Sequence, residues 1–183
     1  GQRPDAYLAC DVSYLRAVAD LFLEGLEISE TDIVILTAKG NPLAIRGLED
    51  LGRPGLRLGT ANPRQSTLGD LTERLLGKLG LLERVRPNIR IQTPTADLLV
   101  NEMRTGALDA AVVYRANTSQ VKDELAIVGI NDPGAKAVQP YAVRKGSVHR
   151  LLMERLRSAI LTEDSRRRYE SLGFRFLAGG TKP

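Results

Sequence analysis

The sequence predicts an α/β fold with two lobes. Short apolar runs rich in β-branched residues alternate with amphipathic helical patterns along the 183 residues, and this alternation is typical of βαβ units around a mixed, mainly parallel sheet. The middle of the chain, about residues 41–131, is an uninterrupted series of such units. Because the first helix and the last two helices lie outside this series, we expect them to form a second lobe.

Seven segments have the length and composition of strands. The run 33–36 is apolar at every position, which predicts a strand buried on both of its faces. The others are short apolar runs bounded by turn residues or helical patterns. The predicted strands are residues 5–9, 33–38, 56–60, 89–92, 110–114, 125–130 and 138–143.

Helical periodicity follows most of these strands. Asp11 can cap the first helix, since its carboxylate can accept the unpaired amide hydrogens of the first turn. Gly80 follows the third helix at the position where glycine ends helices. The predicted helices are residues 12–23, 45–51, 68–79, 96–104, 148–161 and 165–172.

Two segments would connect the lobes. We expect lobe I to comprise residues 1–36 and 138–183, and lobe II residues 37–137. The strands near 33–38 and 138–143 would then cross between the lobes, and paired crossings of this kind make a hinge.

Composition excludes several classes of protein. With 43% apolar and 26% charged residues the chain is within the range of soluble globular proteins. No apolar run approaches the ~20 residues of a membrane-spanning helix, so we expect no direct membrane insertion. The first residues lack an initiator Met and the apolar segment of a signal peptide, so we expect a processed chain, a trimmed chain or a fragment.

The net charge of +4 is unevenly distributed. Residues 1–140 contain 16 Lys and Arg against 18 Asp and Glu, whereas residues 141–183 contain 10 against 4. The run 166–168 is arginine, but acidic residues surround it on a predicted amphipathic helix. It is therefore interpreted as a solvated helix face, and no nucleic-acid partner is expected.

The residues available for catalysis are few. Cys10 is the only cysteine and His149 the only histidine, which leaves no partner for a zinc site or a His-based nucleophile. Nucleotide-binding, zinc-protease and hydrolase motifs are absent from the sequence. Glu49, Asp50 and Asp109 fall at a helix end or a strand entry, where capping or solvation explains them. We therefore expect no enzyme, no catalytic residues, no metal and no cofactor.

Two predicted helix starts are candidate anion sites. Ser66, Thr67 and Leu68 open one helix directly after a strand, and Thr95 and Ala96 open the next. Unpaired amide hydrogens and the positive end of the helix dipole bind anions at such positions. An ordinary explanation is also open, because Thr67 with Asp70 fits a capping box and Thr95 fits a conventional N-cap.

Tyr114 ends the predicted strand 110–114. Ligands of open α/β folds gather beyond the carboxyl ends of strands, so its hydroxyl is a candidate ligand contact. Packing of the ring at the edge of the lobe is the alternative.

Five segments in order resemble one family. Residues 5–11 (DAYLACD), 35–42 (ILTAKGNP), 62–69, 105–114 (TGALDAAVVY) and 141–147 (YAVRKGS) are similar to the periplasmic molybdate-binding proteins of ABC transporters. The resemblance covers nearly the whole chain. It implies a two-lobed fold of the type II periplasmic-binding-protein kind.

The resemblance also implies the ligand contacts. A tetrahedral oxyanion, most often molybdate or tungstate, would lie in the cleft between the lobes on neutral donors. Carried over residue by residue, the contacts are the amides that open the two helices at Leu68 and Ala96, and the Tyr114 hydroxyl. Ala9 replaces the usual serine of lobe I, which leaves the Ala9 and Cys10 amides as donors there. Relatives have a further strand and helix before the position of Gly1, so we expect that these are missing.

By this resemblance the chain is a periplasmic or extracellular binding protein that delivers its oxyanion to an ABC transporter permease. Three alternatives stay open. The chain could be the effector-binding domain of a transcriptional regulator or an enzyme acting on a small acid. It could also bind another anion, such as sulfate, a phosphonate or an organic acid, to which Arg64 or Arg115 would contribute a bidentate contact.

Overall fold

Two strands carry the chain between the two compact units of the computed structural model, which describes residues 3–177. Unit 1 comprises residues 1–31 and 137–183, and unit 2 comprises residues 32–136. The first crossing lies within β2 (Leu26–Ala38) and the second at the start of β7 (Lys136–Val143). Both crossings fall earlier along the chain than the expected boundaries. Residues 1–2 and 178–183 of the expected lobe I lie outside the described residues.

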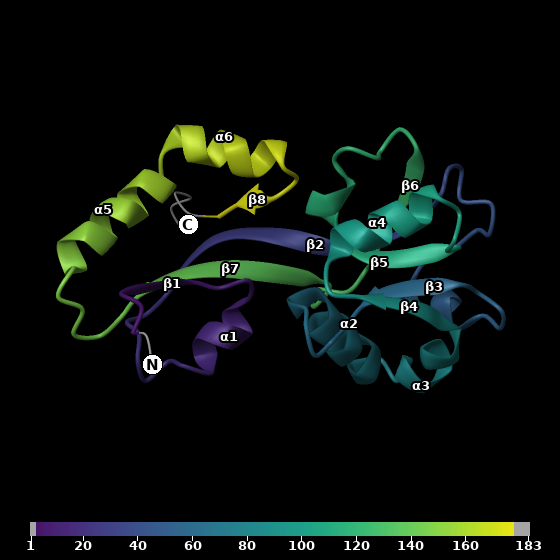
Figure 1. The fold of residues 1–183 in the computed structure, drawn as a ribbon, viewed down its shortest axis with the longest axis horizontal. Helices are drawn as coiled ribbons and strands as arrows, with labels where there is room; N and C mark the ends of the chain where they lie inside the picture. The colour runs from purple at the N-terminus through teal and green to yellow at the C-terminus, as the bar shows by residue number, and fades with distance from the viewer. Residues whose placement is uncertain (1–2, 178–183) are drawn as a thin grey trace. The chain divides into compact units, whose positions relative to one another are not determined.

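A mixed sheet forms the middle of unit 2 (Figure 1). Strand β3 runs parallel to β4 and β5, as the βαβ pattern predicts, whereas β2 runs antiparallel to β5 and β6. The mixed α/β class is confirmed, although antiparallel pairs form a larger part of the sheet than the expectation of mainly parallel pairing allowed. Besides β2, the strands are β3 (Leu58–Ala61), β4 (Ile89–Thr93), β5 (Ala110–Tyr114) and β6 (Leu125–Gly129).

Two helices connect the parallel strands of unit 2. Helix α2 (Thr67–Lys78) follows β3, and α4 (Ala96–Arg104) follows β4. Both are amphipathic, and the apolar face of each contributes to the large core of the unit. The bounds of α4 and β5 are those predicted. Three single-turn elements were not predicted, because one turn is too short to show a periodicity: α3 (Leu82–Val85), η2 (Arg86–Asn88) and η3 (Arg115–Thr118).

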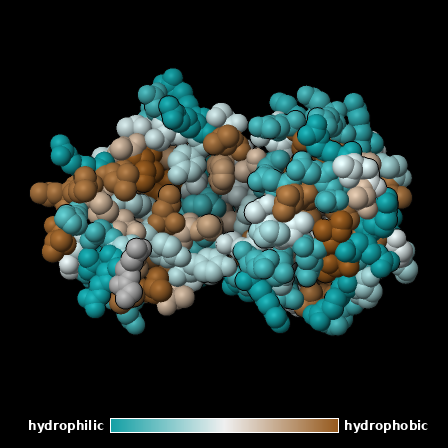
Figure 2. Space-filling model, viewed as in Figure 1, coloured by the Kyte–Doolittle hydropathy of each residue, from teal (hydrophilic) through white to brown (hydrophobic). Residues whose placement is uncertain are grey.

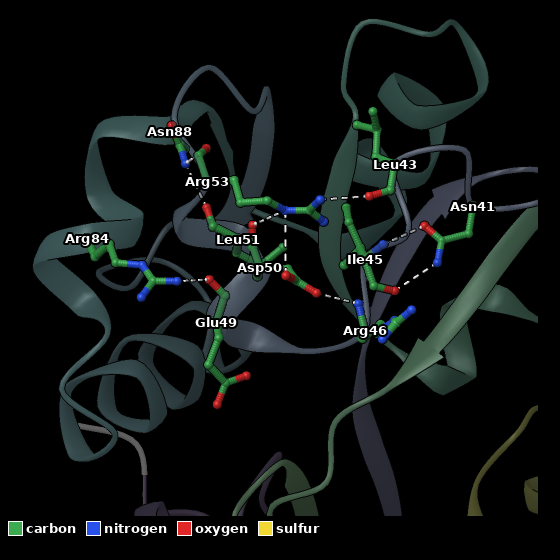
Figure 3. A network of polar contacts seen from close by, with 10 residues as sticks. All are labelled: Asn41, Leu43, Ile45, Arg46, Glu49, Asp50, Leu51, Arg53, Arg84 and Asn88. Carbon is green, nitrogen blue, oxygen red and sulfur yellow. Dashed lines mark hydrogen bonds and ion pairs between the residues drawn. The ribbon is translucent and has the colours of Figure 1, made fainter.

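The predicted helix 45–51 is wrong, since a 3-10 turn, η1 (Leu48–Gly52), stands there. Asn41 has a positive φ of 50°, and its side chain both donates to the Ile45 carbonyl (2.8 Å) and accepts the Ile45 amide (3.0 Å) (Figure 3). These bonds remove the Ile45 backbone from helical pairing. Further along, Asn88 donates to the carbonyls of Leu51 and Arg53, both at 2.7 Å, so the turn is held by side chains from outside it.

Unit 1 has a small core. Among the described residues its core cluster is built on the buried Ile28 and Tyr141, and partly buried residues of the neighbouring helices and strands pack on them. Strand β1 (Ala6–Leu8) pairs antiparallel with β7, and β8 (Arg175–Phe176) pairs antiparallel with the first part of β2. Polar residues of β2 accordingly extend the strand beyond the apolar run that the sequence showed, and β8 was not predicted.

The first helix is much shorter than predicted. Helix α1 (Val12–Arg16) gives way to turns, where the sequence predicted helix over residues 12–23. The reason is a competing pairing: the Leu23 amide donates to the Val143 carbonyl at 2.8 Å, and the buried Phe22 bridges to Arg144. These contacts with the end of β7 pull the segment out of the helix.

Two helices lie between β7 and β8 in unit 1. They are α5 (Arg150–Ile160) and α6 (Glu163–Ser171), close to the predicted ranges. Neither helix has a fully buried residue. On and before α5, Val148, Leu151 and Leu152 are 86%, 78% and 57% exposed, and Figure 2 shows hydrophobic surface where Figure 1 draws this helix. Within residues 3–177, no helix combines the length and apolar composition required to cross a membrane.

Candidate functional site

Three strand ends meet at one edge of the unit 2 sheet. Because β3 lies between β4 and β5 and runs parallel to both, the carboxyl ends of all three point to the same edge (Figure 1). Ala61 at the end of β3 pairs with Thr93 at the end of β4, and the Asn62 amide donates to the Thr93 carbonyl at 2.8 Å. The loops that open α2 and α4 therefore start side by side, as binding sites of open α/β folds do.

The start of α2 is packed directly on the end of β3. A Cβ at Gly69 would lie 2.5 Å from the Ala61 carbonyl oxygen and 2.6 Å from the Pro63 nitrogen. Only glycine lets the first turn of the helix approach the loop backbone this closely. Leu68 is 1% exposed and anchors the same turn in the core. The first amides of α2 are thereby fixed in position at the strand end.

Ser66, and not Thr67, is the N-cap of α2. It has extended backbone (φ −136°, ψ 132°), and its side chain makes no cap hydrogen bond. The capping box of Thr67 with Asp70 does not form, because the amide of Asp70 already pairs with the Ser66 carbonyl at 3.1 Å. By helix geometry, the amides of Thr67, Leu68 and Gly69 have no acceptor within the helix.

Helix α4 begins in the same way. Thr95 is the N-cap with extended backbone (φ −136°, ψ 151°), and its hydroxyl also makes no cap hydrogen bond. Its carbonyl accepts the Thr93 hydroxyl at 2.7 Å, which fixes the turn before the helix. Ala96 follows at 8% exposure. Thr95 is thus the N-cap that the alternative expected, but it lacks the side-chain hydrogen bond of a conventional cap. Both helix starts combine first-turn amides that have no acceptor within the helix with an N-cap hydroxyl that does not bind them.

First-turn acidic side chains of both helices are bound elsewhere. Asp70 of α2 accepts a hydrogen bond from Arg74 Nη2 at 2.7 Å. Asp97 of α4 accepts one from Asn117 Nδ2 at 2.8 Å. Asn117 belongs to η3, and the sequence analysis missed it. The signal available was its place directly after the strand that ends in Tyr114.

Tyr114 ends β5 at the same edge, as predicted. Its ring packs against the large core, and its hydroxyl oxygen is buried. The structure therefore brings together six of the predicted site residues in unit 2: Ser66, Thr67, Leu68, Thr95, Ala96 and Tyr114.

A family model described as bacterial extracellular solute-binding protein matches residues 1–175. The chain belongs to this family. Among its relatives, the molybdate-binding protein ModA of Mycobacterium tuberculosis is 26% identical over 178 residues, which are 95% of this chain and 66% of that protein. The chain thus spans about two thirds of the length of the curated relative that it matches.

Solved structures agree on the fold of this family member. The periplasmic molybdate-binding protein of Azotobacter vinelandii has a TM-score of 0.72 and 17% identity, over 95% of this chain and 79% of that one. The apo ferric ion-binding protein A of Pasteurella haemolytica has a TM-score of 0.82 and 14% identity, over 100% and 72%. The predicted type II binding-protein fold and the resemblance to molybdate-binding proteins are confirmed. At these identities the structural likeness concerns the fold alone.

One of the two donors predicted in unit 1, the Ala9 amide, needs a correction. The Ala9 amide donates to the Pro140 carbonyl at 3.1 Å and Ala9 is 3% exposed, so this amide is not available to a ligand. Cys10 is exposed, and its carbonyl accepts Gln139 Nε2 at 3.2 Å. The carboxylate of Asp11 caps α1 through the Ser13 amide at 2.9 Å. Pairing with the Pro140 carbonyl therefore removes the Ala9 amide from the predicted donor set, while the Cys10 amide stays a prediction.

Two of the three acidic residues considered for catalysis, Asp50 and Asp109, make structural contacts in this solute-binding protein. Asp109 binds Arg57 through Nη2 at 2.6 Å, and this hydrogen bond lowers the pKa of Asp109. Asp50 accepts the Arg46 amide at 2.7 Å. Within residues 3–177 no group of at least three His, Cys, Asp or Glu side chains could hold a metal ion.

The arginines weighed as anion or nucleic-acid contacts are mostly paired. Arg115 binds Asp32 at 3.2 Å. Arg166 binds Glu170 at 2.9 Å, in keeping with a solvated helix face. Arg64 lines a mixed-charge pocket of about 630 Å³ with Arg86, Asp70 and Glu73.

Proposed function

We propose that the chain binds a tetrahedral oxyanion, molybdate or tungstate, at the starts of α2 and α4. The observation that carries this proposal is the pair of uncapped helix starts at one sheet edge, with Ser66 and Thr95 hydroxyls that make no cap hydrogen bond. The likeness to the molybdate-binding protein ModA supports the choice of anion.

Neutral donors suit such an anion. The amides at Leu68 and Ala96 point along the helix axes, so the positive ends of both helix dipoles face the same ligand. Each hydrogen bond to a charged group contributes ~1.5–3 kcal/mol. The hydroxyls of Ser66, Thr95 and Tyr114 would complete the donor set of unit 2 without a counter-cation.

The fold does not choose the ligand by itself, since a ferric ion-binding protein shares it. Sulfate carries the same charge and shape as molybdate, so discrimination between them would come from the size of the site. Arg64 could add a bidentate contact to a larger anion such as a phosphonate.

We also propose that the chain delivers its ligand to an ABC transporter permease, in the periplasm or outside the cell, and its membership of the extracellular solute-binding family supports this. No catalysed reaction is proposed, because the acidic residues near the sheet are bound to arginine or backbone amides.

A ligand screen tests the proposal. Thermal unfolding is measured with sodium molybdate, tungstate, sulfate and phosphate, and with neutral sugars and amino acids as controls. A ligand at 100 times its dissociation constant raises the free energy of unfolding by about 2.7 kcal/mol. An oxyanion that binds should therefore raise the midpoint of thermal unfolding measurably. A shift with an amino acid and none with any oxyanion would contradict the proposal.

A further inference from the structure

Asp97 lies in the first turn of α4, immediately after Ala96. A carboxylate at this position normally stabilises a helix, because it faces the positive end of the dipole. In the proposed anion site the same carboxylate would compete with the ligand for the same amides. It would also repel the ligand by its charge.

Asn117 holds this carboxylate. Its Nδ2 donates to Asp97 Oδ1 at 2.8 Å, which ties η3 to the start of α4. The carboxylate of Asp97 therefore has a hydrogen-bond donor outside the helix start. The amides of the first turn, which Thr95 does not cap, then stay available.

The contact has a cost in stability. The Asn117 Oδ1 is buried, and within residues 3–177 it has no hydrogen-bond partner. Buried acceptors without a partner are rare, and each calls for an explanation. Selection for the Nδ2 donor of Asn117, which binds Asp97, explains why its Oδ1 acceptor is left without a partner among the described residues.

The start of α2 repeats the arrangement with different residues. Asp70 is bound to Arg74, one turn further along the helix, at 2.7 Å. Both helices of the proposed site therefore have an acidic residue in the first turn and a side chain that binds it. Arg74 does this with a charge, Asn117 with a neutral amide.

We propose that Asn117 is a positioning residue for the oxyanion: it holds the Asp97 carboxylate away from the α4 amides and so raises the affinity for the ligand. This inference rests on the proposed function. It assigns Asn117 no direct contact with the anion.

Calorimetric titration with sodium tungstate tests the role. Asn117→Ala releases Asp97 and should weaken binding about three- to tenfold, the scale of one charge at a helix end. Asn117→Asp keeps the size of the side chain but replaces the donor with a second carboxylate, so its loss should be larger. Asn101→Ala, an exposed Asn on the same helix, is the matched control and should bind as the unchanged protein does.

The decisive variant is the double one. In Asp97→Asn with Asn117→Ala the carboxylate is gone, so affinity should return to within about twofold of the unchanged protein. A structural role for Asn117 would give the same loss in the single and the double variant, and this result would overturn the inference while the proposed function stands. If the unchanged protein binds none of tungstate, molybdate and sulfate, the proposed function fails and the inference with it. Thermal unfolding of each variant checks that all are folded at the titration temperature.

Discussion

Asp109 and Arg57 bind each other through both side chain and backbone. The Asp109 carboxylate accepts the Arg57 guanidinium at 2.6 and 3.1 Å and the Arg57 amide at 2.8 Å, and the Asp109 amide donates to the Arg57 carbonyl at 2.8 Å. Arg57 directly precedes β3 and Asp109 directly precedes β5. The pair therefore aligns the two parallel strands whose other ends carry the proposed site.

Asp109→Asn should destabilise the protein by roughly 1 kcal/mol at pH 7, because the neutral amide loses the charge-assisted part of a pair that solvent screens on the half-exposed Arg57 side. The arginine lowers the pKa of Asp109. The ionised Asp109 carboxylate therefore stabilises the folded protein fully above the unfolded pKa of roughly 4. This contribution to the free energy of unfolding is lost as the pH falls through the lower pKa of the folded state. Urea unfolding at pH 7 and at pH 3 measures this. A difference between the proteins that stays the same at both pH values would contradict it.

Ser147→Ala should raise the pKa of Asp5 towards its ordinary value. The Ser147 hydroxyl donates to Asp5 Oδ1 at 2.7 Å and is the largest cause of the lowered pKa of Asp5, ahead of Arg144. A carboxyl-detected NMR titration of both proteins gives the two values. An unchanged titration curve would mean that the Ser147 hydroxyl does not lower the pKa of Asp5.

Gly69→Ala should cost roughly 2 kcal/mol or more of stability and abolish oxyanion binding, because a Cβ there meets backbone atoms at 2.5 Å and displaces the start of α2. Gly77→Ala in the same helix is the control, since a Cβ there meets nothing within 4 Å. It should stabilise by about 0.5–1 kcal/mol. Thermal unfolding and tungstate titration are measured for both variants. Equal effects of Gly69→Ala and Gly77→Ala on stability would refute the close approach at Gly69.

Ser66→Ala should leave stability within about 0.5 kcal/mol, because the hydroxyl does not cap α2. It should weaken oxyanion binding roughly tenfold, as the loss of one hydrogen bond to a charged ligand does. Thr162→Ala is the contrasting variant, since Thr162 caps α6 through the Ser165 amide at 3.3 Å. It should lose about 1 kcal/mol of stability and no affinity. Chemical unfolding and calorimetry give both quantities; the opposite pattern would show Ser66 to be an ordinary cap.

Tyr114→Phe should weaken oxyanion binding by roughly ten- to a hundredfold while the ring continues to pack on the core. Calorimetry gives the affinity, and the thermal midpoint reports the packing. If phenylalanine binds the anion as tightly as tyrosine does, the residue serves packing alone.

The order of elements in unit 2 was predictable because the spacing of apolar residues indicates which positions are buried, and turn and cap residues indicate where elements begin and end. Apolar runs matched β5, and the helical period with its flanking turns matched α4 residue for residue. The strand ends that carry Ser66, Thr95 and Tyr114 followed from the same alternation. Binding groups at those ends could therefore be named before their geometry was known.

What the sequence by itself determined is the α/β class, the positions of the two helix starts and the shortage of catalytic side chains. Only the tertiary structure decided which polar groups of the chain pair with one another. The Ala9 amide donates to the Pro140 carbonyl, the Leu23 amide donates to the Val143 carbonyl instead of continuing a helix, and the Asn117 side chain donates to Asp97. The physical reason is the same in each case. A hydrogen bond between residues far apart in the chain competes with the local pattern and leaves no periodic trace in the sequence.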